Sequence, residues 1–550
     1  MTAVVRSERR IARLRMAAAS PGTGLRPTLT AYLQQHLNAF QEGFRHNLAI
    51  VGPAGSGKSV LLRHVLEAAS RDASIVYCSL QRDSLRTFLK QFSAAVLRAA
   101  AGVSDELPFE AVLDRAQACA PRTAEAIRAL LERHATGHVP AEAFTHALDV
   151  IPLLHDECRR PCVLVLDEFL HLEDLGLSHA FHELGKRVMT WPFVFFLVTS
   201  SSSYRARDIL RERLHLLFGQ FELVSLSTIE PDAALAWMQT ELPGVQAQPE
   251  IAQFVLHWLG GSPWAIHLLL RRMQERMRLG GERRVSTGTL FQAAWDVLGS
   301  PDGALYHWCA TRLEQVIHHP HGLLAREALI AVACGARTSQ AIAKQTGTAR
   351  HVASALQLLV EHDLVERKGA CWVMIDQLMA CWVATILGSS ERDSAPSRAA
   401  SKQRFAEILL AMWTSWEGAA SQSLAQRIGG LLSQFHNETV SLDSKTGRLP
   451  SFDSLQDHRP FQDGTTYLVA DSTDRRWCCL IHEGALEESG IAAFEHFCRA
   501  QHPRPTRKVV NAHAGLELNA KLLAKESNMW VWEPQDMHLL FLLYGQPPLR

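Results

Sequence analysis

The chain has no run of about 18 apolar residues, so the sequence predicts no helix that crosses a membrane. It also has no excess of charge of one sign, because 56 lysines and arginines balance 56 aspartates and glutamates. A balanced chain has no global field that would draw it to nucleic acid or to a membrane, so any such surface must be local. Apolar residues make up 47% of the 550 residues, which is typical of several globular domains with ample cores.

The 11 cysteines show no metal-binding pattern. Cys158 and Cys162 are close in sequence, but no Cys or His pair at zinc-finger spacing follows them, which argues against a structural zinc. Scattered reduced cysteines are typical of a reducing compartment, so we expect a cytoplasmic protein.

Residues 1–26 lack an apolar segment behind their arginines, which argues against a secretory signal. We expect a basic N-terminal arm here, and an organelle-targeting peptide is the alternative. The arginines of this arm are Arg6, Arg9, Arg10, Arg13 and Arg15.

What the sequence does contain is a phosphate loop in residues 47–62, NLAIVGPAGSGKSVLL. An apolar strand is followed by a glycine-rich turn and by a helix that Ser59 is predicted to open. The glycines let consecutive backbone N–H groups point at phosphate oxygens beside the positive end of that helix. Lys58 is predicted to reach the β- and γ-phosphates, and the Ser59 hydroxyl to ligate Mg²⁺. The predicted nucleotide contacts are Gly52, Pro53, Ala54, Gly55, Ser56, Gly57, Lys58, Ser59 and Val60.

A second informative stretch is PCVLVLDEFLHLE, residues 161–173. Its consecutive apolar residues predict a central parallel strand that is buried on both faces. Asp167 at the carboxyl end of this strand is predicted to hold the water shell of Mg²⁺. Glu168 beside it is the predicted catalytic group that orients and deprotonates the attacking water.

Three further strands are predicted at residues 74–80, 192–199 and 221–226, with an inserted helical layer between residues 84 and 158. Alternating strands and helices with long apolar strands predict an α/β fold with a parallel sheet that helices cover on both faces. In such a sheet the ligand lies at the carboxyl ends of the strands.

From Pro231 the pattern turns helical, and Gly260, Gly261, Ser262 and Pro263 open another helix. With these helices after the strands, the chain from about 47 to 277 resembles AAA-type and STAND (signal-transduction) ATPases of the archaeal branch that includes origin-recognition-like proteins. In that branch a helical lid follows the nucleotide-binding core. The resemblance implies ATP and Mg²⁺ as cofactors, a P-loop core at 27–228 and a helical lid at 229–318, with Pro263 near the adenine. It also implies that Thr199 or Ser200, at a strand end, senses the γ-phosphate, and a plain serine turn is the alternative.

Members of this branch often place an arginine shortly after the fourth strand or near a leucine-Tyr-Gly-Arg turn, and Gln220 stands at the latter place here. Substitute arginine fingers are sought among Arg205, Arg207, Arg211 and Arg213, whose spacing also fits an exposed helix face. Arg271 and Arg272 of the lid are further candidates for the γ-phosphate.

Residues 319–388 resemble a winged helix-turn-helix, with a recognition helix at 349–361, capped by Thr348, and a two-stranded wing around Lys368 and Gly369. DNA would be read by Arg350, His351, Ser354 and Gln357 and held at its phosphates by Arg367 and Lys368. The alternative is an interaction module that binds other parts of the protein, other proteins or further copies of the chain. The predicted helix also carries the acidic Glu361, and the density of basic residues is modest, so DNA binding and the interaction module both stay open.

A polar linker, residues 389–403, precedes a C-terminal α/β region at 404–550. The order of its predicted elements resembles a restriction-endonuclease-like core. The signature of that fold is an acid on one strand and Glu-x-Lys on the next, and only Asp471 fits it, because Leu480 and His482 occupy the second strand. We therefore predict a domain that binds or scaffolds rather than cuts.

Together these features predict an ATP-binding, slowly hydrolysing switch of the AAA/STAND type. One rival is an ATP-regulated nuclease of a defence or mobile-element system, which requires Asp471 and Glu483 to bind one metal. The other is a DNA-binding regulator that does not hydrolyse ATP.

Overall fold

A computed structural model describes residues 24–70, 72–103, 107–213, 221–226, 229–241, 249–281, 284–388, 398–442, 445–458 and 464–547. They form two compact units, residues 1–244 with 261–270, and residues 245–260 with 271–550. The predicted arm up to residue 23, Gln220 and the linker up to residue 397 lie outside the described residues. None of the described helices has the length and apolar character that crossing a membrane requires.

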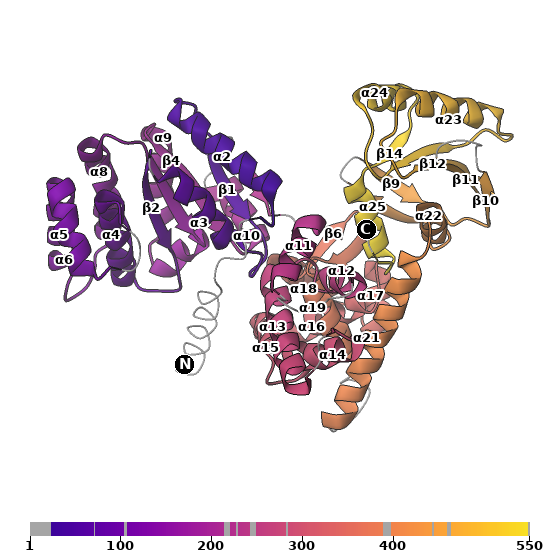
Figure 1. Cartoon of the computed structure of the whole chain (residues 1–550), viewed down its shortest axis with the longest axis horizontal. Helices are drawn as coiled ribbons and strands as arrows, with labels where there is room; N and C mark the ends of the chain where they lie inside the picture. Colours follow the sequence, from indigo (N-terminus) through magenta and orange to yellow (C-terminus); the bar gives the residue numbers. More distant parts are fainter. Residues whose placement is uncertain are drawn as a thin grey trace. The chain divides into compact units, whose positions relative to one another are not determined.

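The first unit is built on a parallel sheet with the strand order β2-β3-β4-β1-β5 (Figure 1). The predicted α/β fold class is thereby confirmed. All residues of β1, β3 and β4 are buried, as their apolar runs predict. The strands are β1 (Asn47–Val51), β2 (Ser74–Ser79), β3 (Cys162–Asp167), β4 (Val194–Ser200) and β5 (Phe221–Ser225).

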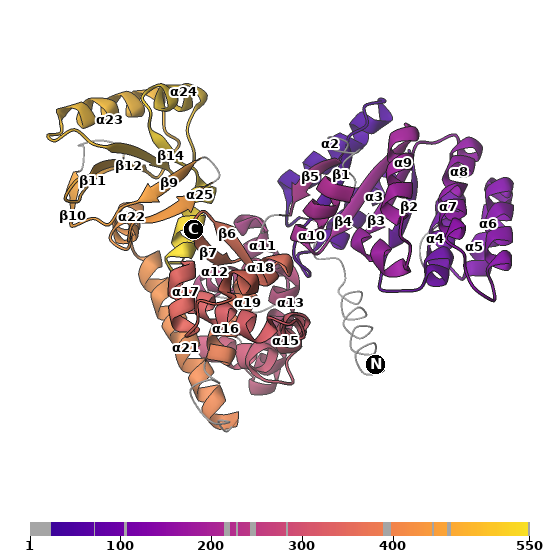
Figure 2. The same cartoon turned by 180° about the vertical axis from the view of Figure 1, so that it is seen from behind.

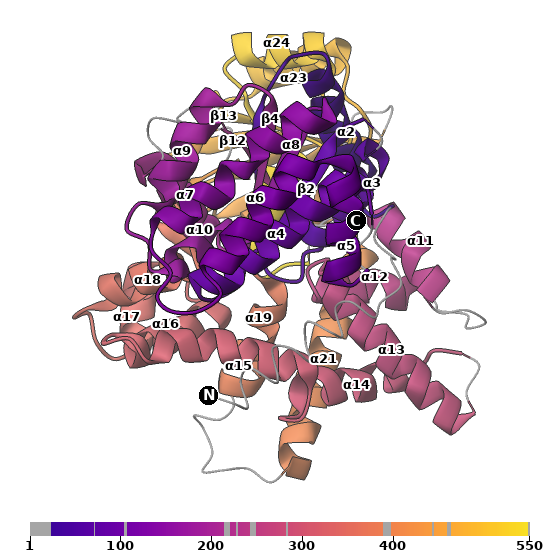
Figure 3. The ribbon, with the colours of Figure 1, turned by 90° about the vertical axis from the view of Figure 1, so that its left-hand side faces the viewer.

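Helices cover both faces of this sheet. One face packs against α2 (Pro27–Gln41) and α3 (Lys58–Ala69) through residues such as Ile50 and Val165. The other face packs against the predicted helical insertion through the alternate residues of the same strands. Figure 3 shows this helical layer from its outer side. Its helices are α4 (Leu85–Ala101), α5 (Phe109–Cys119), α6 (Pro121–Arg133), α7 (Glu142–Leu148) and α8 (Val150–Cys158).

Shorter elements complete the first unit. They are η1 (Phe169–Leu175), α9 (Ala180–Thr190), α10 (Ser203–Asp208), η2 (Ile209–Arg213) and α11 (Pro231–Glu241). Helix α13 (Pro263–Gly280) begins in this unit and continues into the second one. Its start therefore belongs to the same compact body as the phosphate loop.

The second unit begins with helices and a small hairpin, β6 (Val365–Lys368) and β7 (Cys371–Met374). Aromatic rings hold part of it together: Phe254 contacts Trp413 and Trp416 at centroid distances of 5.0 and 5.7 Å. The helices are α12 (Pro249–Trp258), α14 (Thr287–Ala294), η4 (Trp295–Gly299), α15 (Ala304–Ile317), α16 (Gly322–Ala333), α17 (Ser339–Gln345), α18 (Val352–Glu361), α19 (Gln377–Trp382), η5 (Val383–Leu387) and α21 (Arg398–Ala420).

The helix predicted at 349–361 begins three residues later, at Val352. The backbone of His351 is left-handed, with φ 63°, and so cannot belong to the helix. Thr348, the predicted cap, instead accepts a hydrogen bond from the backbone N–H of Arg350 at 3.2 Å. Arg350 and His351 therefore precede the helix, a correction to the predicted recognition surface. Thr338 does cap α17, accepting from Ala341 N at 3.2 Å.

The C-terminal region contains a mixed sheet with the order β10-β11-β12-β13-β14 (Figure 2). Helices α23 and α24 cover one face and α22 and α25 the other. The sequence predicts strands at 467–470, 477–481, 507–511 and 529–532 and helices at 491–500 and 516–525, and all six are present with ends shifted by a few residues. The elements are α22 (Leu424–Leu432), β8 (Glu438–Ser441), β9 (Thr446–Leu449), β10 (Ser454–His458), β11 (Thr465–Asp471), β12 (Arg476–His482), α23 (Glu488–Ala500), β13 (Arg507–Ala512), α24 (Leu518–Glu526), β14 (Trp530–Trp532) and α25 (Pro534–Leu543).

The tip of the β6–β7 hairpin is packed against strand β8. The backbone N–H of Ala370 donates to Thr439 O at 2.8 Å. Cys371 and Val373 of β7 are part of the core that β11–β14, α22 and α25 form. The hairpin and the C-terminal region therefore share one apolar core.

Gly369 offers a test of this packing. Its φ is +72°, and a Cβ there would lie 2.7 Å from Thr439 O and 2.9 Å from Ser441 N. Gly347 has a similar φ of +70° but open space around its Cα. We expect Gly347→Ala to lower the free energy of unfolding by about 1–2 kcal/mol, the cost of a left-handed alanine. Gly369→Ala should cost roughly 1–3 kcal/mol more, because β8 must also move.

Urea unfolding of the full chain, followed by tryptophan fluorescence, measures both losses. Equal losses for the two variants would show that the hairpin tip does not press on β8.

Candidate functional site

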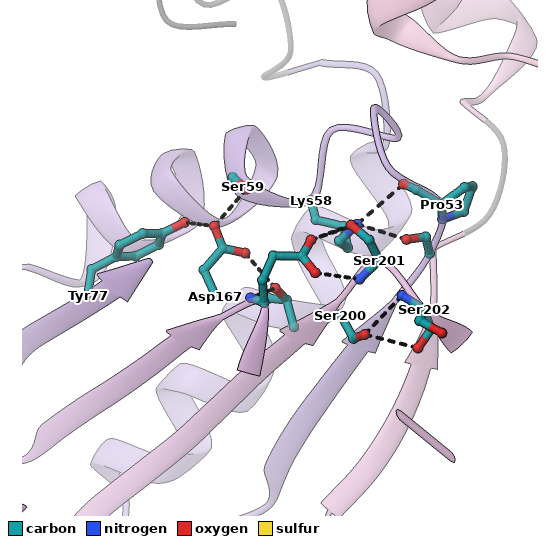
Figure 4. A network of polar contacts seen from close by, with 11 residues as sticks. Pro53, Lys58, Ser59, Tyr77, Asp167, Ser200, Ser201 and Ser202 are labelled. Carbon is teal, nitrogen blue, oxygen red and sulfur yellow. Dashed lines mark hydrogen bonds and ion pairs between the residues drawn. The ribbon is translucent and has the colours of Figure 1, made fainter. Parts of the chain in front are cut away.

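The predicted site residues meet at the carboxyl ends of β1, β3 and β4 (Figure 4). The phosphate loop joins β1 to α3, which begins at Lys58 with Gly57 as its N-cap, one residue before the predicted start. Gly55 and Gly57 have φ values of +81° and +91°, a conformation that glycine adopts without steric cost. The loop therefore has the backbone that a phosphate cradle requires.

The ammonium group of Lys58 is enclosed by oxygen atoms. It donates to Gly52 O at 2.7 Å, to Pro53 O at 3.3 Å and to Ser201 Oγ at 2.9 Å. Glu168 Oε1 lies 3.6 Å from the same nitrogen, and the Lys58 side chain is only 4% exposed. A phosphate that reaches Lys58 has to replace some of these oxygens, because an ammonium has three donors.

Asp167 is the centre of the hydrogen-bond network drawn in Figure 4. Its Oδ2 accepts from Ser59 Oγ at 2.8 Å and from Tyr77 OH at 2.6 Å, and its Oδ1 accepts from Thr199 Oγ1 at 2.5 Å. Ser59 and Asp167, the two predicted metal residues, are thus in direct contact. A carboxylate beside a hydroxyl fits Mg²⁺, which binds one or two carboxylates together with substrate phosphates.

Glu168 follows directly in a left-handed conformation, with φ 58°. Such a backbone costs a residue with a side chain about 1–2 kcal/mol. Its carboxylate accepts from Ser201 N at 2.7 Å and from the Ser201 hydroxyl, and its own N–H donates to Thr199 Oγ1 at 3.0 Å. The strained backbone therefore turns this carboxylate from β3 toward the end of β4 and toward Lys58.

The two residues predicted to sense the γ-phosphate have different surroundings. Thr199 is fully buried and bridges Asp167 to the backbone of Glu168. The Ser200 hydroxyl instead donates to Ser202 O at 2.9 Å and accepts from Ser202 N at 3.0 Å. The hydroxyl of the next residue, Ser201, contacts both Lys58 and Glu168. Ser201 lies just past the strand, where strand alternation no longer tells which way a side chain points.

The start of α13 and the residue before α2 lie beside the phosphate loop. A Cβ on Gly57 would be 3.8 Å from Pro263 Cγ, the predicted lid contact, and 3.6 Å from Arg26 Nη1. A Cβ on Gly55 would be 3.3 Å from the Trp264 ring. Burial lowers the pKa of the Arg26 guanidinium to about 10, an effect that Glu230 opposes. Arg26 was placed in the basic arm, and no sequence pattern marks it or Trp264 as site residues.

Several predicted arginines have other partners among the described residues. Arg205 pairs with Glu173, and Arg207 Nη2 lies 3.5 Å from Ser225 Oγ. Arg272 donates to Asp296 at 2.7 Å and to Glu275 at 2.9 Å, which raise its pKa. Arg211 and Arg271 are exposed, and the side chain of Arg213 lies outside the described residues.

The acids of the nuclease hypothesis lie apart. Strands β11 and β12 are antiparallel, with Asp471 opposite Arg476 and Thr465 opposite His482. Asp471 is therefore at one end of the pair and Glu483 just past the other end, about 23 Å apart at 3.3 Å per residue. Both oxygens of Asp471 bind Arg476, at 2.5 and 2.9 Å. The described residues contain no cluster of three or more His, Cys, Asp or Glu side chains that could hold a metal.

The cations predicted to hold DNA phosphates also have partners. Lys368 pairs with Glu366 at 2.9 Å, and Arg367 Nε donates to Gly369 O at 2.9 Å. His351, just before the neighbouring helix α18, and Ser354 and Gln357 on that helix are exposed. Glu366 therefore offsets the charge of Lys368, whereas Arg367 contacts a neutral carbonyl oxygen.

Residues 25–195 match the family model of an AAA ATPase domain. The matched stretch contains the phosphate loop, Asp167 and Glu168. A search of the curated proteins found no match.

Solved structures with a similar fold include three archaeal proteins. A Walker-type ATPase of Pyrococcus abyssi is 14% identical, with a TM-score of 0.45, covering 65% of this chain and 95% of that one. The Aeropyrum pernix ORC2 protein, in complexes with ADPNP and ADP, is 15% identical with a TM-score of 0.44, covering 72% and 97%. The ORC1 protein of the same organism, in complex with DNA, is 15% identical with a TM-score of 0.35, covering 68% and 95%.

Proposed function

We propose that the protein binds Mg–ATP at the carboxyl ends of its parallel sheet and hydrolyses it slowly, as a switch of the AAA/STAND type. The convergence of Lys58, Ser59 and Asp167 in one network, with Glu168 and Ser201 beside them, supports the proposal most directly. These groups come from three strand ends and supply a cation, two carboxylates and hydroxyls at one point. That combination fits binding and hydrolysis of a nucleoside triphosphate.

Each residue then has a role. The loop N–H groups and Lys58 bind the β- and γ-phosphates, and Ser59 and Asp167 hold Mg²⁺. The metal neutralises charge that develops on the phosphate oxygens. Glu168 orients a water molecule and accepts its proton while the water oxygen bonds to the γ-phosphorus. The bond from that phosphorus to the β–γ bridging oxygen breaks, which leaves ADP and phosphate.

The contacts of Glu168 give a reason for slow turnover. Its carboxylate already accepts two hydrogen bonds from Ser201 and lies 3.6 Å from Lys58. A phosphate that draws Lys58 away removes one of these partners and leaves Glu168 freer to bind water. Nucleotide binding and activation of the base are thereby linked through Lys58.

We further propose that residues 229–318 act as a lid and that residues 319–388 form a winged helix used as a protein interaction module. The packing of the hairpin tip against β8 and the partners of Arg367 and Lys368 favour this role over DNA binding. The C-terminal region is proposed to bind or scaffold, because its acids do not converge on a metal site.

Lys58→Ala is expected to weaken ATP binding by about ten- to hundredfold, because a charge-assisted contact to phosphate is lost. Titration with a fluorescent ATP analogue measures this affinity. Lys186→Ala, which removes an exposed lysine paired with Glu183, is the control and should bind like the wild type. Undiminished binding by folded Lys58→Ala protein would refute the assignment of the site.

Glu168→Gln is expected to keep ATP affinity within about threefold and to slow hydrolysis by about tenfold or more, because only the group that accepts the proton of water is changed. Single-turnover phosphate release together with nucleotide titration separates the two effects. A parallel loss of binding and hydrolysis would assign Glu168 to nucleotide binding instead.

The double variant Arg367→Ala, Lys368→Ala tests the winged-helix assignment. The affinity for a short DNA duplex is measured at several salt concentrations for the variant and the wild type. We expect the same slope of log affinity against log salt, because Lys368 is paired with Glu366 and the tip of the hairpin packs against β8 rather than facing a duplex. A slope shallower by about one unit per lost phosphate contact would establish the hairpin as a DNA surface.

A further inference from the structure

Tyr77 contributes a contact to Asp167 that the roles above leave unassigned. It lies on β2, which pairs with β3 in parallel, and its hydroxyl donates to Asp167 Oδ2 at 2.6 Å. Figure 4 shows the tyrosine reaching Asp167 from the side opposite Ser201. Two separate strands, β2 and β4, thus supply hydroxyl donors to a carboxylate on the strand between them.

The tyrosine itself is held in place. Its ring packs in the cluster that α2 and α3 form on one face of the sheet. The guanidinium of Arg63, on α3, lies 5.9 Å from the ring centroid, within reach of a cation–π contact.

The hydrogen bonds determine which lone pair of Asp167 is left for a ligand. A carboxylate has about four lone-pair sites. Ser59 and Tyr77 use both sites on Oδ2, and Thr199 uses one on Oδ1. The remaining site is therefore on Oδ1. Without Tyr77, each oxygen of the carboxylate would accept one of these hydrogen bonds. The last side-chain torsion of aspartate is broad and roughly two-fold, so the carboxylate would rotate more freely.

We propose that Tyr77 is a positioning residue for Mg²⁺: it fixes the carboxylate of Asp167 so that Oδ1 accepts from a water of the metal shell. This inference rests on the proposed function. Hydrogen-bond partners of a metal-binding carboxylate usually contribute about ten- to hundredfold to metal affinity or activity. A single phenol hydroxyl, with two other donors still in place, should act at the lower end of that range.

The test is Tyr77→Phe in the full chain. Mn²⁺ is titrated against protein and ADP, and bound metal is measured by electron paramagnetic resonance. We expect Mn²⁺ affinity to fall about tenfold. The Mg²⁺ concentration for half-maximal ATP hydrolysis should rise by about the same factor, while nucleotide binding in EDTA stays unchanged. Tyr32→Phe is the matched control, because Tyr32 packs in the same apolar cluster and Asp167 does not contact it in the structure.

A second variant covers the case in which Tyr77→Phe does not fold. Arg63→Met removes the cation over the ring, and we expect it to weaken Mn²⁺ binding by about two- to threefold through a less fixed tyrosine. Unchanged Mn²⁺ affinity in folded Tyr77→Phe, or in Arg63→Met if only that variant folds, overturns the proposal while nucleotide binding stands. A wild-type protein that binds neither nucleotide nor metal overturns the proposed function as well.

Discussion

A buried carboxylate needs donors in place of the water it has lost, and Asp167 obtains them from its neighbours on the sheet. The residue is 4% exposed at the end of a strand that is buried on both faces. Its donors are hydroxyl groups from α3, β2 and β4. The order of strands β2-β3-β4-β1 places these donors on both sides of β3, so the topology of the sheet determines the chemistry of the site.

The same requirement governs Lys58 and Glu168. The side chain of Lys58 is 4% exposed and that of Glu168 is 28% exposed, their charged groups lie 3.6 Å apart, and the Ser201 hydroxyl contacts both. Burying one charge without a partner costs several kcal/mol. The two charges of the site therefore offset each other, and under the proposed function a phosphate would compete with these contacts.

The sequence predicted the features that depend on local pattern. Apolar runs gave the five parallel strands, and the glycines around Lys58 gave the loop. In the C-terminal region, strand and helix periodicity predicted the elements from β11 to β14 but missed β8, β9, β10 and α25. Contacts between distant segments could not be predicted. Tyr77 has the pattern of an ordinary aromatic residue in a strand. Ser201 follows the end of β4 and Arg26 precedes α2, so the periodicity of those elements does not predict where the two side chains point. The late start of α18 depends on the left-handed backbone of His351. Because this residue is not a glycine, the sequence does not indicate that conformation.

The hairpin that packs on β8 has a consequence for how the chain can be divided. The polar stretch after residue 388 is the obvious place to cut by composition, yet Cys371 and Val373, before it, belong to the same core as Trp530 and Phe541, far beyond it. A fragment that ended at this stretch would expose an apolar face to water, and exposed faces of this kind promote aggregation. The boundary that composition suggests and the boundary of the packed core therefore fall in different places.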